Sequence, residues 1–544
     1  TRGQADLFKT GTFRLKWRAK VGYFPHPDGE TIVSAGEPCG RWQHDNTQKL
    51  NVGDNLKKFA ELPLNGYIPG SSIRGLVRAW ATTQGEIKPR IKELLGEQDK
   101  ESIYPGKVEF LDAYPQEPTK ITLDIVNPQQ EFQVYHRGQS TPLSFYTLGD
   151  GEEEIPFTVA IRGIPHRITP AELAEVWGWV EQALCFYGVG SRTASGYGVI
   201  KAEGVKPKLP ENIAKKTFNF SLYSQGSYGV SQKQEELRPS HWRGWLRSWL
   251  LRFLLGVMSQ ENAEKTLGEL LGTIGTENNS QACKGCVRIK MIPGNTWGEE
   301  SENSPYFYCW KGQLQIFAPK DILNGVILPI VRFAVSVGGV GRGWRRPLHI
   351  FKTDRGYEAA RGTYLKLTHK VKDKTTGKSK NRLFALNPSN TQIWQKTYQT
   401  WLDAVRSKWS NRVQIGVNNN LAAEVFSPTT CAIYLVPAPV EEPVDFADLA
   451  WNFTQPEATR GDGMNLIYQP QYKRKPDVGG NAGSGKAACS WVSIKRVNVA
   501  HPTEDTDCQE IVCLFMGGEN RLRSRFLAEL SRISGGNNLF GVKA

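Results

Sequence analysis

The sequence predicts an α+β protein built from two tandem units that share one order of elements. Two short stretches support this, "IRGLVRAW" at 73–80 and "WRGWLRSW" at 242–249, which have the same pattern of apolar, Arg, Gly, apolar, apolar, Arg, small and Trp residues. Each is followed by strand-like segments, a long apolar helix and a loop rich in glycine and arginine. A repeated order of elements indicates internal duplication, and alternating strands and helices with short connections favour mainly antiparallel sheets.

The chain of 544 residues is basic, with a composition typical of a folded protein. Its 39% of hydrophobic and 10% of aromatic residues can fill proper cores, which excludes wholesale disorder. The net charge of +14 favours a polyanionic partner, nucleic acid before a membrane. Nine cysteines without regular spacing favour a reducing compartment over a disulfide framework, so we expect a cytoplasmic protein.

No segment of the sequence is expected to enter a membrane. The first residues lack the apolar core of a signal peptide. The most apolar segment, 322–341, is interrupted by Asn324, Pro329 and Arg332 and is too short to span a bilayer. It is therefore predicted to be a buried helix.

The first unit is predicted over residues 1–205. Segment 13–19 alternates apolar and basic residues, as a half-buried strand does. Thr169 is a good helix N-cap because Pro170 follows it and Glu172 stands three residues on. The first arginine helix is expected from residue 68 onward. Further strands are expected at 106–115, 120–126 and 156–163, and a glycine loop at 188–200.

The second unit is predicted to repeat this order after a linker at 206–216, which is rich in lysine and proline and has no aromatic residue. Its core is expected over 217–350, with the arginine helix at 239–256 and an apolar helix at 320–337. The remaining residues, 351–544, are interpreted as an insertion plus the completion of the second unit. They contain a lysine-rich hairpin at 370–382 and a tryptophan-rich helix at 391–409.

The arginine helices have the character of anion-binding sites. In the first helix Ile73, Val77 and Trp80 share the core-facing stripe, while Arg74 and Arg78 are neighbours on another face. Serines at the helix start can cap it, and its N–H groups and dipole favour a phosphate. The alternative is that the arginines merely solvate an exposed face, but the matched copies favour binding. The predicted residues are Ser71, Ser72, Arg74 and Arg78, and, in the second copy, Ser240, Arg243 and Arg247.

The two glycine loops, "GVGSRTASGYG" and "GGVGRGWRRP", are the second set of candidates. Glycine lets backbone approach a ligand closely, and the flanking Arg192, Arg342 and Arg345 can bind phosphate with two parallel hydrogen bonds. A dinucleotide fingerprint is excluded, because these glycines follow a helix and lead into a strand. The P-loop-like stretch at 480–487 has Ala487 where Ser or Thr would hold magnesium, so it is interpreted as a flexible loop.

Cys283 and Cys286 form a CxxC pair, which is a frequent half of a zinc site. A structural zinc site needs four ligands, and only Cys309 lies nearby downstream. A turn between strands is therefore favoured over a zinc site.

Three motifs in order, "YIPGSSIRGLVR", "VEFLDAYP" and "GVGSRTASGYGVI", resemble the RAMP (repeat-associated mysterious protein) superfamily of CRISPR systems, above all the backbone subunits of type III effector complexes. "LDIVNP" before "TPLSFYTLG" is similar to the subunit that caps the type III-B filament. The likeness spans nearly all of 10–202, is weaker over 217–350 and is not detectable from 351 onward. The tandem arrangement resembles the fused subunits of type III-D variants.

This resemblance implies a ferredoxin-like, RRM-related core in each unit, with a protruding thumb hairpin of the first unit within 115–155. Members hold guide RNA by its backbone, and base pairing reads the target RNA. It implies guide RNA (crRNA), target RNA and other type III subunits as partners. A free-standing basic RNA-binding protein is the alternative without partner subunits.

The resemblance also implies where a nuclease centre would lie. Slicing members use an aspartate thirteen residues before the residue that precedes "IPGSS", and counting back from Tyr67 gives Asp54. A carboxylate there would act with Mg²⁺ or Mn²⁺, as a metal ligand or by positioning the 2′-hydroxyl. Asp45 is the runner-up and Asp28 comes third. The alternatives are an inert Asp54 in a non-catalytic scaffold, and histidine chemistry through His26 and His44. The second unit lacks an aspartate at 217–238, so it is expected to bind RNA without cutting it.

Overall fold

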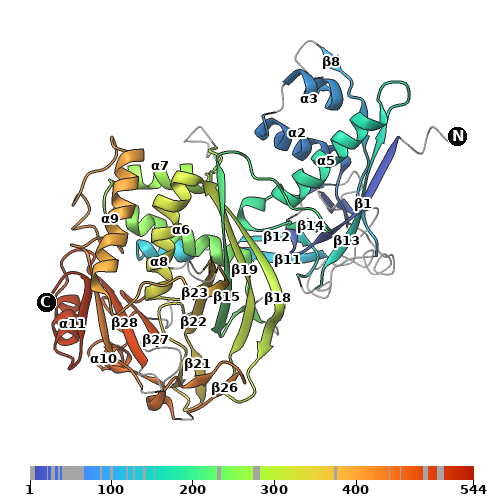
Figure 1. The fold of residues 1–544 in the computed structure, drawn as a ribbon. Coiled ribbons are helices and arrows are strands. Elements are labelled where there is room, and N and C mark those ends of the chain that lie inside the picture. The colour runs from blue at the N-terminus through green and yellow to red at the C-terminus, as the bar shows by residue number, and fades with distance from the viewer. Residues whose placement is uncertain are drawn as a thin grey trace. The chain divides into compact units, whose positions relative to one another are not determined.

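The structure of the protein, a computed structural model, has an α+β fold that divides into two compact units (Figure 1). The predicted α+β class is confirmed. Unit 1 comprises Thr1–Val126, Leu143–Ala214 and Arg288–Ile292, and unit 2 comprises Asn127–Pro142, Lys215–Val287 and Pro293–Ala544. The structure describes residues 7–20, 22–25, 31–34, 37–38, 66–85, 88–98, 102–117, 121–126, 129–138, 143–151, 153–228, 235–273, 282–372, 377–439, 441–453, 455–481, 488–498 and 508–544.

The main sheet of unit 1 is antiparallel, and its strands follow the order β10-β13-β1-β14, with β9 also paired to β13. Helix α5 packs on β1 and β13, and α2 packs on α5. If α2 with α3 counts as one helical segment, and β9 with β10, which both pair with β13, as one interrupted strand, the order along the chain is strand, helix, two strands, helix, strand. The elements are β1 (Phe8–Leu15), α2 (Gly70–Thr83), α3 (Lys88–Leu95), β9 (Val108–Phe110), β10 (Tyr114–Pro115), β13 (Ile155–Gly163), α5 (Pro170–Tyr187) and β14 (Ile200–Ala202).

Helices α2 and α5 of unit 1 form for the reasons that the sequence predicts. Ile73 and Val77 are fully buried and Trp80 is only 5% exposed, so the apolar stripe of α2 faces the core. The side chain of Thr169 accepts a hydrogen bond from the N–H of Glu172, and the Glu172 carboxylate accepts one from the N–H of Thr169. The predicted cap of α5 is therefore confirmed.

A second, three-stranded sheet of unit 1 has the order β11-β12-β2. Its strands β11 and β12 form an antiparallel pair inside the range predicted for the thumb hairpin. Between them the chain contributes Asn127–Pro142, including helix α4, to unit 2. The elements are β2 (Ala19–Lys20), β11 (Ile121–Val126), α4 (Gln129–Val134) and β12 (Leu143–Leu148).

The first sheet of unit 2 has the order β18-β19-β15-β22-β23, so its first four strands repeat the spatial order of unit 1. Helices α6 and α7 follow β15, and a π-helical turn that continues as α8 follows β19. The first five residues of β18 are grouped with unit 1. The elements are β15 (Ile213–Ser224), α6 (Pro239–Leu255), α7 (Gln260–Leu271), β18 (Arg288–Glu300), β19 (Tyr308–Pro319), η3 (Ile322–Ile327), α8 (Leu328–Val337), β22 (Thr363–Lys372) and β23 (Ser379–Leu383).

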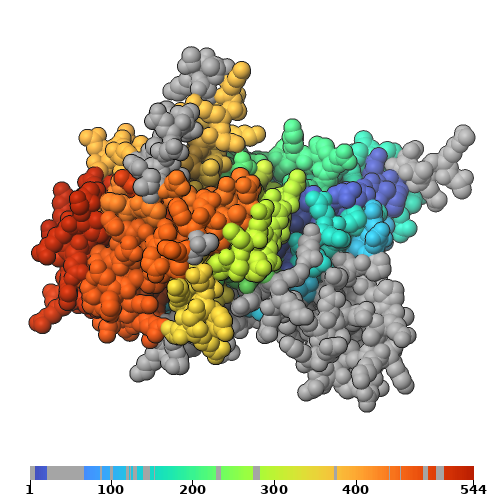
Figure 2. Space-filling view, turned by 90° about the horizontal axis from the view of Figure 1, so that it is seen from below, coloured from blue at the N-terminus to red at the C-terminus, as the bar shows by residue number. Residues whose placement is uncertain are grey.

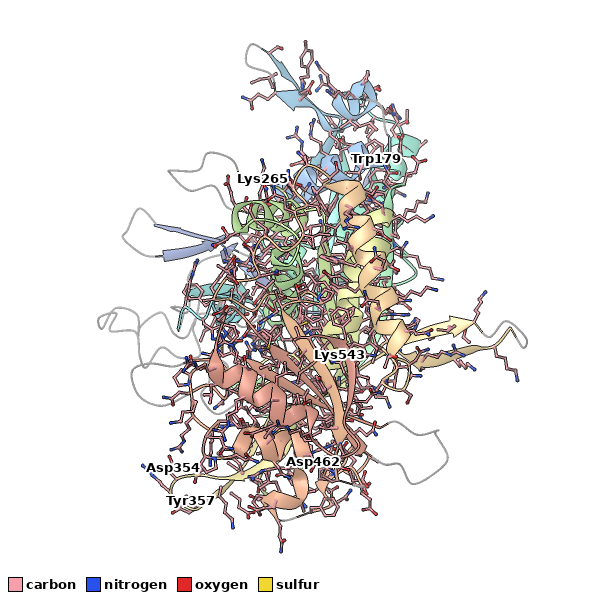
Figure 3. All side chains as sticks on the ribbon, turned by 90° about the vertical axis from the view of Figure 1, so that its left-hand side faces the viewer. Trp179, Lys265, Asp354, Tyr357, Asp462 and Lys543 are labelled. Atoms are coloured by element: carbon pink, nitrogen blue, oxygen red, sulfur yellow. The ribbon has the colours of Figure 1, made fainter. Side chains whose placement is uncertain are left out.

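The β22–β23 hairpin extends away from the body of unit 2 (Figure 3). Every residue of β23 is exposed. The hairpin is strongly basic, and its exposed cationic residues are Lys366, Lys370, Lys372, Lys378, Lys380 and Arg382.

The rest of unit 2 is a second antiparallel sheet of order β27-β28-β24-β29 with three helices. Helix α8 packs on β27 and β28, and α9 packs on β29. Because α8 also packs on the second arginine helix, α6, this sheet and α6 share one core. The segments from α9 onward form one continuous orange-to-red body (Figure 2). The elements are α9 (Thr391–Lys408), β24 (Cys431–Pro437), α10 (Asp462–Tyr468), β27 (Val492–Asn498), β28 (Cys508–Phe515), α11 (Arg521–Ser531) and β29 (Asn537–Gly541).

Short strand pairs complete the described fold. None of the helices in the described ranges is long and apolar enough to cross a membrane. The pairs are β3 (Gly22–Pro25) with β4 (Thr31–Ser34), β5 (Glu37–Pro38) with β6 (Gly66–Tyr67), β7 (Glu97–Gln98) with β8 (Ile103–Tyr104), β16 (Ser227–Tyr228) with β17 (Glu235–Glu236), β20 (His349–Lys352) with β21 (Glu358–Arg361), and β25 (Val444–Asp445) with β26 (Ala450–Trp451).

Candidate nucleic-acid interface

The first arginine helix lines an open depression of about 400 Å³ on unit 1. Three of the predicted residues, Ser71, Arg74 and Arg78, meet there, and we call them the first arginine site. Ser72 is exposed on the same turn of α2. Glu97 and Gln98 complete the lining. Sequence reasoning missed these two, because they come from the strand after α3 and carry no motif.

The two guanidinium groups of the first arginine site are held by the end of α3. Nε of Arg74 donates to the carbonyl oxygen of Leu95 at 2.8 Å, and Arg78 donates to the carbonyl oxygen of Gly96. The C-terminal carbonyls of a helix attract cations, which explains this placement. Partial burial and the neighbouring charge of Arg78 lower the pKa of Arg74. Within the described ranges neither arginine is paired with a carboxylate, so a bound anion would relieve their repulsion.

The start of α2 is already partly satisfied by the chain. The N–H of Gly70 donates to Oδ1 of Asp112 at 2.8 Å, and the N–H groups of Ser72 and Ile73 donate to the carbonyl of Pro69. The helix-start donors expected for a phosphate are thus largely occupied. The exposed hydroxyl groups and the guanidinium groups are what this site offers an anion.

The second arginine helix repeats the first in an unexpected detail. Arg243 donates to the carbonyl of Leu271, the last residue of α7, as Arg74 does to that of Leu95, the last residue of α3. Both α3 and α7 end in Glu-Leu-Leu and are followed by glycine, which gives the sequence "ELLG" at 93–96 and 269–272. This second repeat is not among the motifs that the sequence analysis identified. The arginine helix and the helix after it thus share the same contact in both units.

The glycines of the two "ELLG" stretches have the same role. Gly96 and Gly272 have φ of 71° and 86°. A Cβ on Gly96 would lie 2.5 Å from the N atom of Gly106, and one on Gly272 would lie 3.1 Å from the N atom of Gly285. The segments that contain Gly106 and Gly285 thus pack in the same way on the C-terminal ends of α3 and α7. Cys283 and Cys286 flank this contact, and in the described part of the chain they join no group of three metal-ligating side chains.

The second arginine helix differs from the first at Arg247. Its guanidinium pairs with Glu131 of α4, with Nε–Oε2 at 2.6 Å and Nη2–Oε1 at 3.2 Å. Ser240 stands half-buried on the first turn of α6. The second arginine site, Ser240, Arg243 and Arg247, therefore already contains an anionic group.

The glycine loops pack on the chain itself. A Cβ on Gly198, which has φ of 64°, would lie 1.8 Å from the carbonyl oxygen of Val189, so this backbone contact requires glycine. Arg192 is half-buried and Arg342 is exposed, and both reach the surface of their loops. Arg345 is only 7% exposed and pairs with Glu424 at 2.7 Å. Of the three predicted loop arginines, Arg345 is thus part of the core of unit 2.

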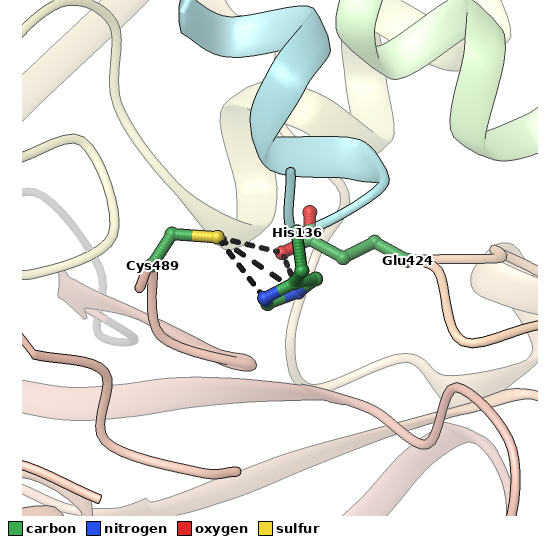
Figure 4. Close-up of side chains that lie close together, drawn as sticks. All are labelled: His136, Glu424 and Cys489. Atoms are coloured by element: carbon green, nitrogen blue, oxygen red, sulfur yellow. Dashed lines mark hydrogen bonds and ion pairs between the residues drawn. The ribbon is translucent and has the colours of Figure 1, made fainter. Parts of the chain in front are cut away.

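Glu424 is the centre of a buried ion network in unit 2 (Figure 4). Its carboxylate accepts from Nε of Arg252 at 2.8 Å and lies 2.7 Å from Nη2 of Arg345 and 3.1 Å from Nε2 of His136. Burial alone would raise the pKa of Glu424, but Arg345 and Arg252 hold it at about 2.

Cys489 completes this network, since its Sγ lies 3.4 Å from Nδ1 of His136. The donor atoms of His136, Glu424 and Cys489 are close enough together to hold a metal ion. However, both oxygens of Glu424 are bound by arginines, and burial raises the pKa of the Cys489 thiol to about 12. Two buried cations and a protonated thiol do not suit a metal ion, so we interpret the cluster as an ion-pair network.

The predicted nuclease residues lie outside the described residues. This applies to Asp54 and Asp45 and equally to Asp28, His26 and His44. Catalysis and its divalent metal therefore stay predictions.

Comparison with known proteins supports the predicted resemblance. Residues 42–201 match the sequence model of the RAMP superfamily. No curated protein matched the chain. Similar solved structures include Cmr6 from Pyrococcus furiosus, at 20% identity over 36% of this chain and 97% of that chain with a TM-score of 0.21. Others are Cmr1 from Pyrococcus furiosus, at 10% identity over 60% and 99% with a TM-score of 0.31, and a chain of a type IV-B CRISPR complex, at 12% over 37% and 95% with a TM-score of 0.21.

The matched range contains the first arginine helix, the strand "VEFLDAYP" and the first glycine loop, which are the three motifs that carried the resemblance. Residues 42–201 of this chain are therefore similar in sequence to the RAMP superfamily.

Proposed function

We propose that this protein is a guide-RNA-binding backbone subunit of a type III CRISPR interference complex. The observation that carries the proposal is the first arginine site. It places two guanidinium groups, which meet no carboxylate among the described residues, in an open depression within the RAMP-like segment of a basic chain. Its partners would be guide RNA, target RNA and other subunits of the complex.

The chemistry of the first arginine site suits an RNA backbone. The carbonyls of Leu95 and Gly96 fix the two guanidinium groups in advance, so less side-chain entropy is lost when a phosphate binds. The hydroxyls of Ser71 and Ser72 add acceptors and donors for phosphate or a 2′-hydroxyl. Contacts of this kind to the RNA backbone would leave sequence recognition to base pairing. Arg192 and Arg342, on the two glycine loops, are further candidate contacts.

The sheet order supports the finer fold proposal. In both units, four strands follow the chain order strand, helix, two strands, helix, strand. If these strands are numbered 1 to 4 along the chain, their order across the sheet is 2-3-1-4. This is the order of a ferredoxin-like βαββαβ unit. We therefore propose two tandem ferredoxin-like units, with β11 and β12 as the base of the first thumb hairpin.

The double variant R74A/R78A is expected to bind single-stranded guide RNA about tenfold more weakly, because each lost guanidinium removes a charge-assisted phosphate contact. The plot of log affinity against log salt concentration should become shallower by about 1.4, at about 0.7 for each lost contact. Fluorescence anisotropy over a salt series measures both. R474A, which removes a guanidinium that is 62% exposed, is the matched control. Unchanged affinity of R74A/R78A would contradict the proposal.

We further propose that the first unit cleaves target RNA through Asp54 with a divalent metal. The assembled complex carrying D54A is expected to retain guide and target binding but to lose one cut in guide-complementary RNA, and chelation of Mg²⁺ or Mn²⁺ should remove the same cut. D45A is the control. Gel analysis of the cleavage products decides the question. A ladder that is unchanged in D54A supports the alternative, a non-catalytic scaffold that only binds guide RNA.

A further inference from the structure

The second arginine site is occupied by the chain's own segment 129–138, which we call the insert. Glu131 of the insert makes a two-point contact with the guanidinium of Arg247. A carboxylate that receives two parallel N–H groups presents the same acceptor geometry that a phosphate would present. In the first arginine site the corresponding guanidinium, that of Arg78, donates to a backbone carbonyl and meets no carboxylate in the part of the chain that the structure describes.

The insert is anchored by the residues that follow Glu131. The N–H of Glu424 donates to the carbonyl of Val134 at 2.8 Å, and the Val134 side chain is fully buried. Nε1 of Trp344 donates to Oε1 of Gln133 at 3.1 Å. These contacts fix the position of α4 independently of the ion pair.

Two contacts after α4 complete the anchoring. The hydroxyl of Tyr135 donates to Glu264 at 2.8 Å. The ring of His136 stacks on that of Trp491, with centroids 3.6 Å apart and planes inclined by 6°. Because Glu131 is tethered by these contacts, its local concentration at Arg247 is on the order of millimolar or higher, which an RNA phosphate must exceed to displace it.

The ion pair is also accessible enough to test. The side chains of Arg247 and Glu131 are 28% and 30% exposed. An RNA strand could therefore reach this guanidinium if the carboxylate were absent. The second arginine site is therefore closed to RNA because Glu131 occupies it, and not because the site is buried.

We propose that Glu131 is an internal substitute for phosphate in the second arginine site, so that the first arginine site grips RNA and the second holds the insert. This rests on the proposed RNA-binding function and departs from the prediction that both copies bind RNA. The duplicated helix has kept its arginines, but one of them now recognises an acidic segment of the same chain.

The test compares five variants of the full chain with the wild type by RNA anisotropy over a salt series. R247A is expected to change affinity less than twofold, whereas R74A/R78A loses about tenfold. E131A releases Arg247, so affinity should rise severalfold and the salt plot should steepen by about 0.7. The double variant E131A/R247A should return to wild-type behaviour. Y135F loosens the insert without changing charge, and its salt slope should equal that of the wild type.

Hydrogen exchange gives a readout that does not depend on affinity. Adding RNA to the wild type should leave amide exchange across 129–138 unchanged. Faster exchange there, or an R247A loss as large as that of R74A/R78A, would show that RNA displaces Glu131 and would overturn the inference. An E131A variant without a steeper salt slope would overturn it too. If R74A/R78A alone binds like the wild type, the proposed function fails, and the inference fails with it.

Discussion

Replacing Glu424 with alanine is expected to lower the free energy of unfolding of unit 2 by about 3–5 kcal/mol, because the change leaves buried cations without their counter-ion. Arg252 is fully buried and Arg345 is 7% exposed, and both bind this one carboxylate. Removal of the carboxylate also leaves the imidazole of His136 without its acidic partner. Neither guanidinium can reach water without disrupting the core.

Chemical denaturation followed by tryptophan fluorescence measures this effect. The matched control is D354A, which breaks the ion pair with Arg474, whose side chains are 62% and 80% exposed. Such an exposed pair contributes about 0–1 kcal/mol. If E424A unfolded at nearly the same denaturant concentration as D354A, the network would not have the structural role that its burial implies.

Acidification from pH 6 to pH 4 is expected to destabilise unit 2 by about 2 kcal/mol through His349 alone, because one differentially bound proton changes the free energy of unfolding by about 1.4 kcal/mol per pH unit. His349 is fully buried, and its Nδ1 lies 2.7 Å from the carbonyl oxygen of Pro347, which can only accept a hydrogen bond. The proton therefore sits on Nδ1, and Nε2 accepts from the hydroxyl of Tyr468 at 2.8 Å.

The direction follows from the pKa shift. Burial, with the nearby charges of Arg460, Arg361 and Arg346, lowers the pKa of His349 from 6.5 to about 3. Below pH 6.5 the imidazole is protonated in the unfolded chain but not in the folded chain. The contribution of neutral His349 to the free energy of unfolding is therefore complete above pH 6.5 and is lost as the pH falls toward 3. H349Q should make the plot of unfolding free energy against pH shallower by one proton over pH 4–6, as measured by denaturation at each pH. Parallel plots for H349Q and the wild type would refute this assignment.

Local patterns in the sequence predicted local structure well. The stripe of Ile73, Val77 and Trp80 and the cap at Thr169 are both found as expected, since each depends on residues within a few positions. The order of elements was readable for the same reason. The resemblance over the first unit is confirmed by the family match.

The partners of the arginines could not be predicted in this way. Glu131 lies 116 residues from Arg247, and Glu424 lies 172 residues from Arg252, so no local pattern announces either pair. Arg345 stands in a glycine-rich loop with two other arginines, and only the fold shows that it meets a buried carboxylate. The "ELLG" repeat was visible in the sequence, but its meaning depends on the hydrogen bonds that Arg74 and Arg243 make to it.

The course of the chain also sets an order of events during synthesis. His136 of the insert contacts Cys489, which is 353 residues later in the chain. At 5–20 residues per second, a ribosome needs roughly 20–70 s to make that stretch. Over this interval the insert has left the ribosome while its receptor does not yet exist. The insert can therefore complete its contacts only after the last part of unit 2 has been synthesised, although it is made among the first residues of the chain.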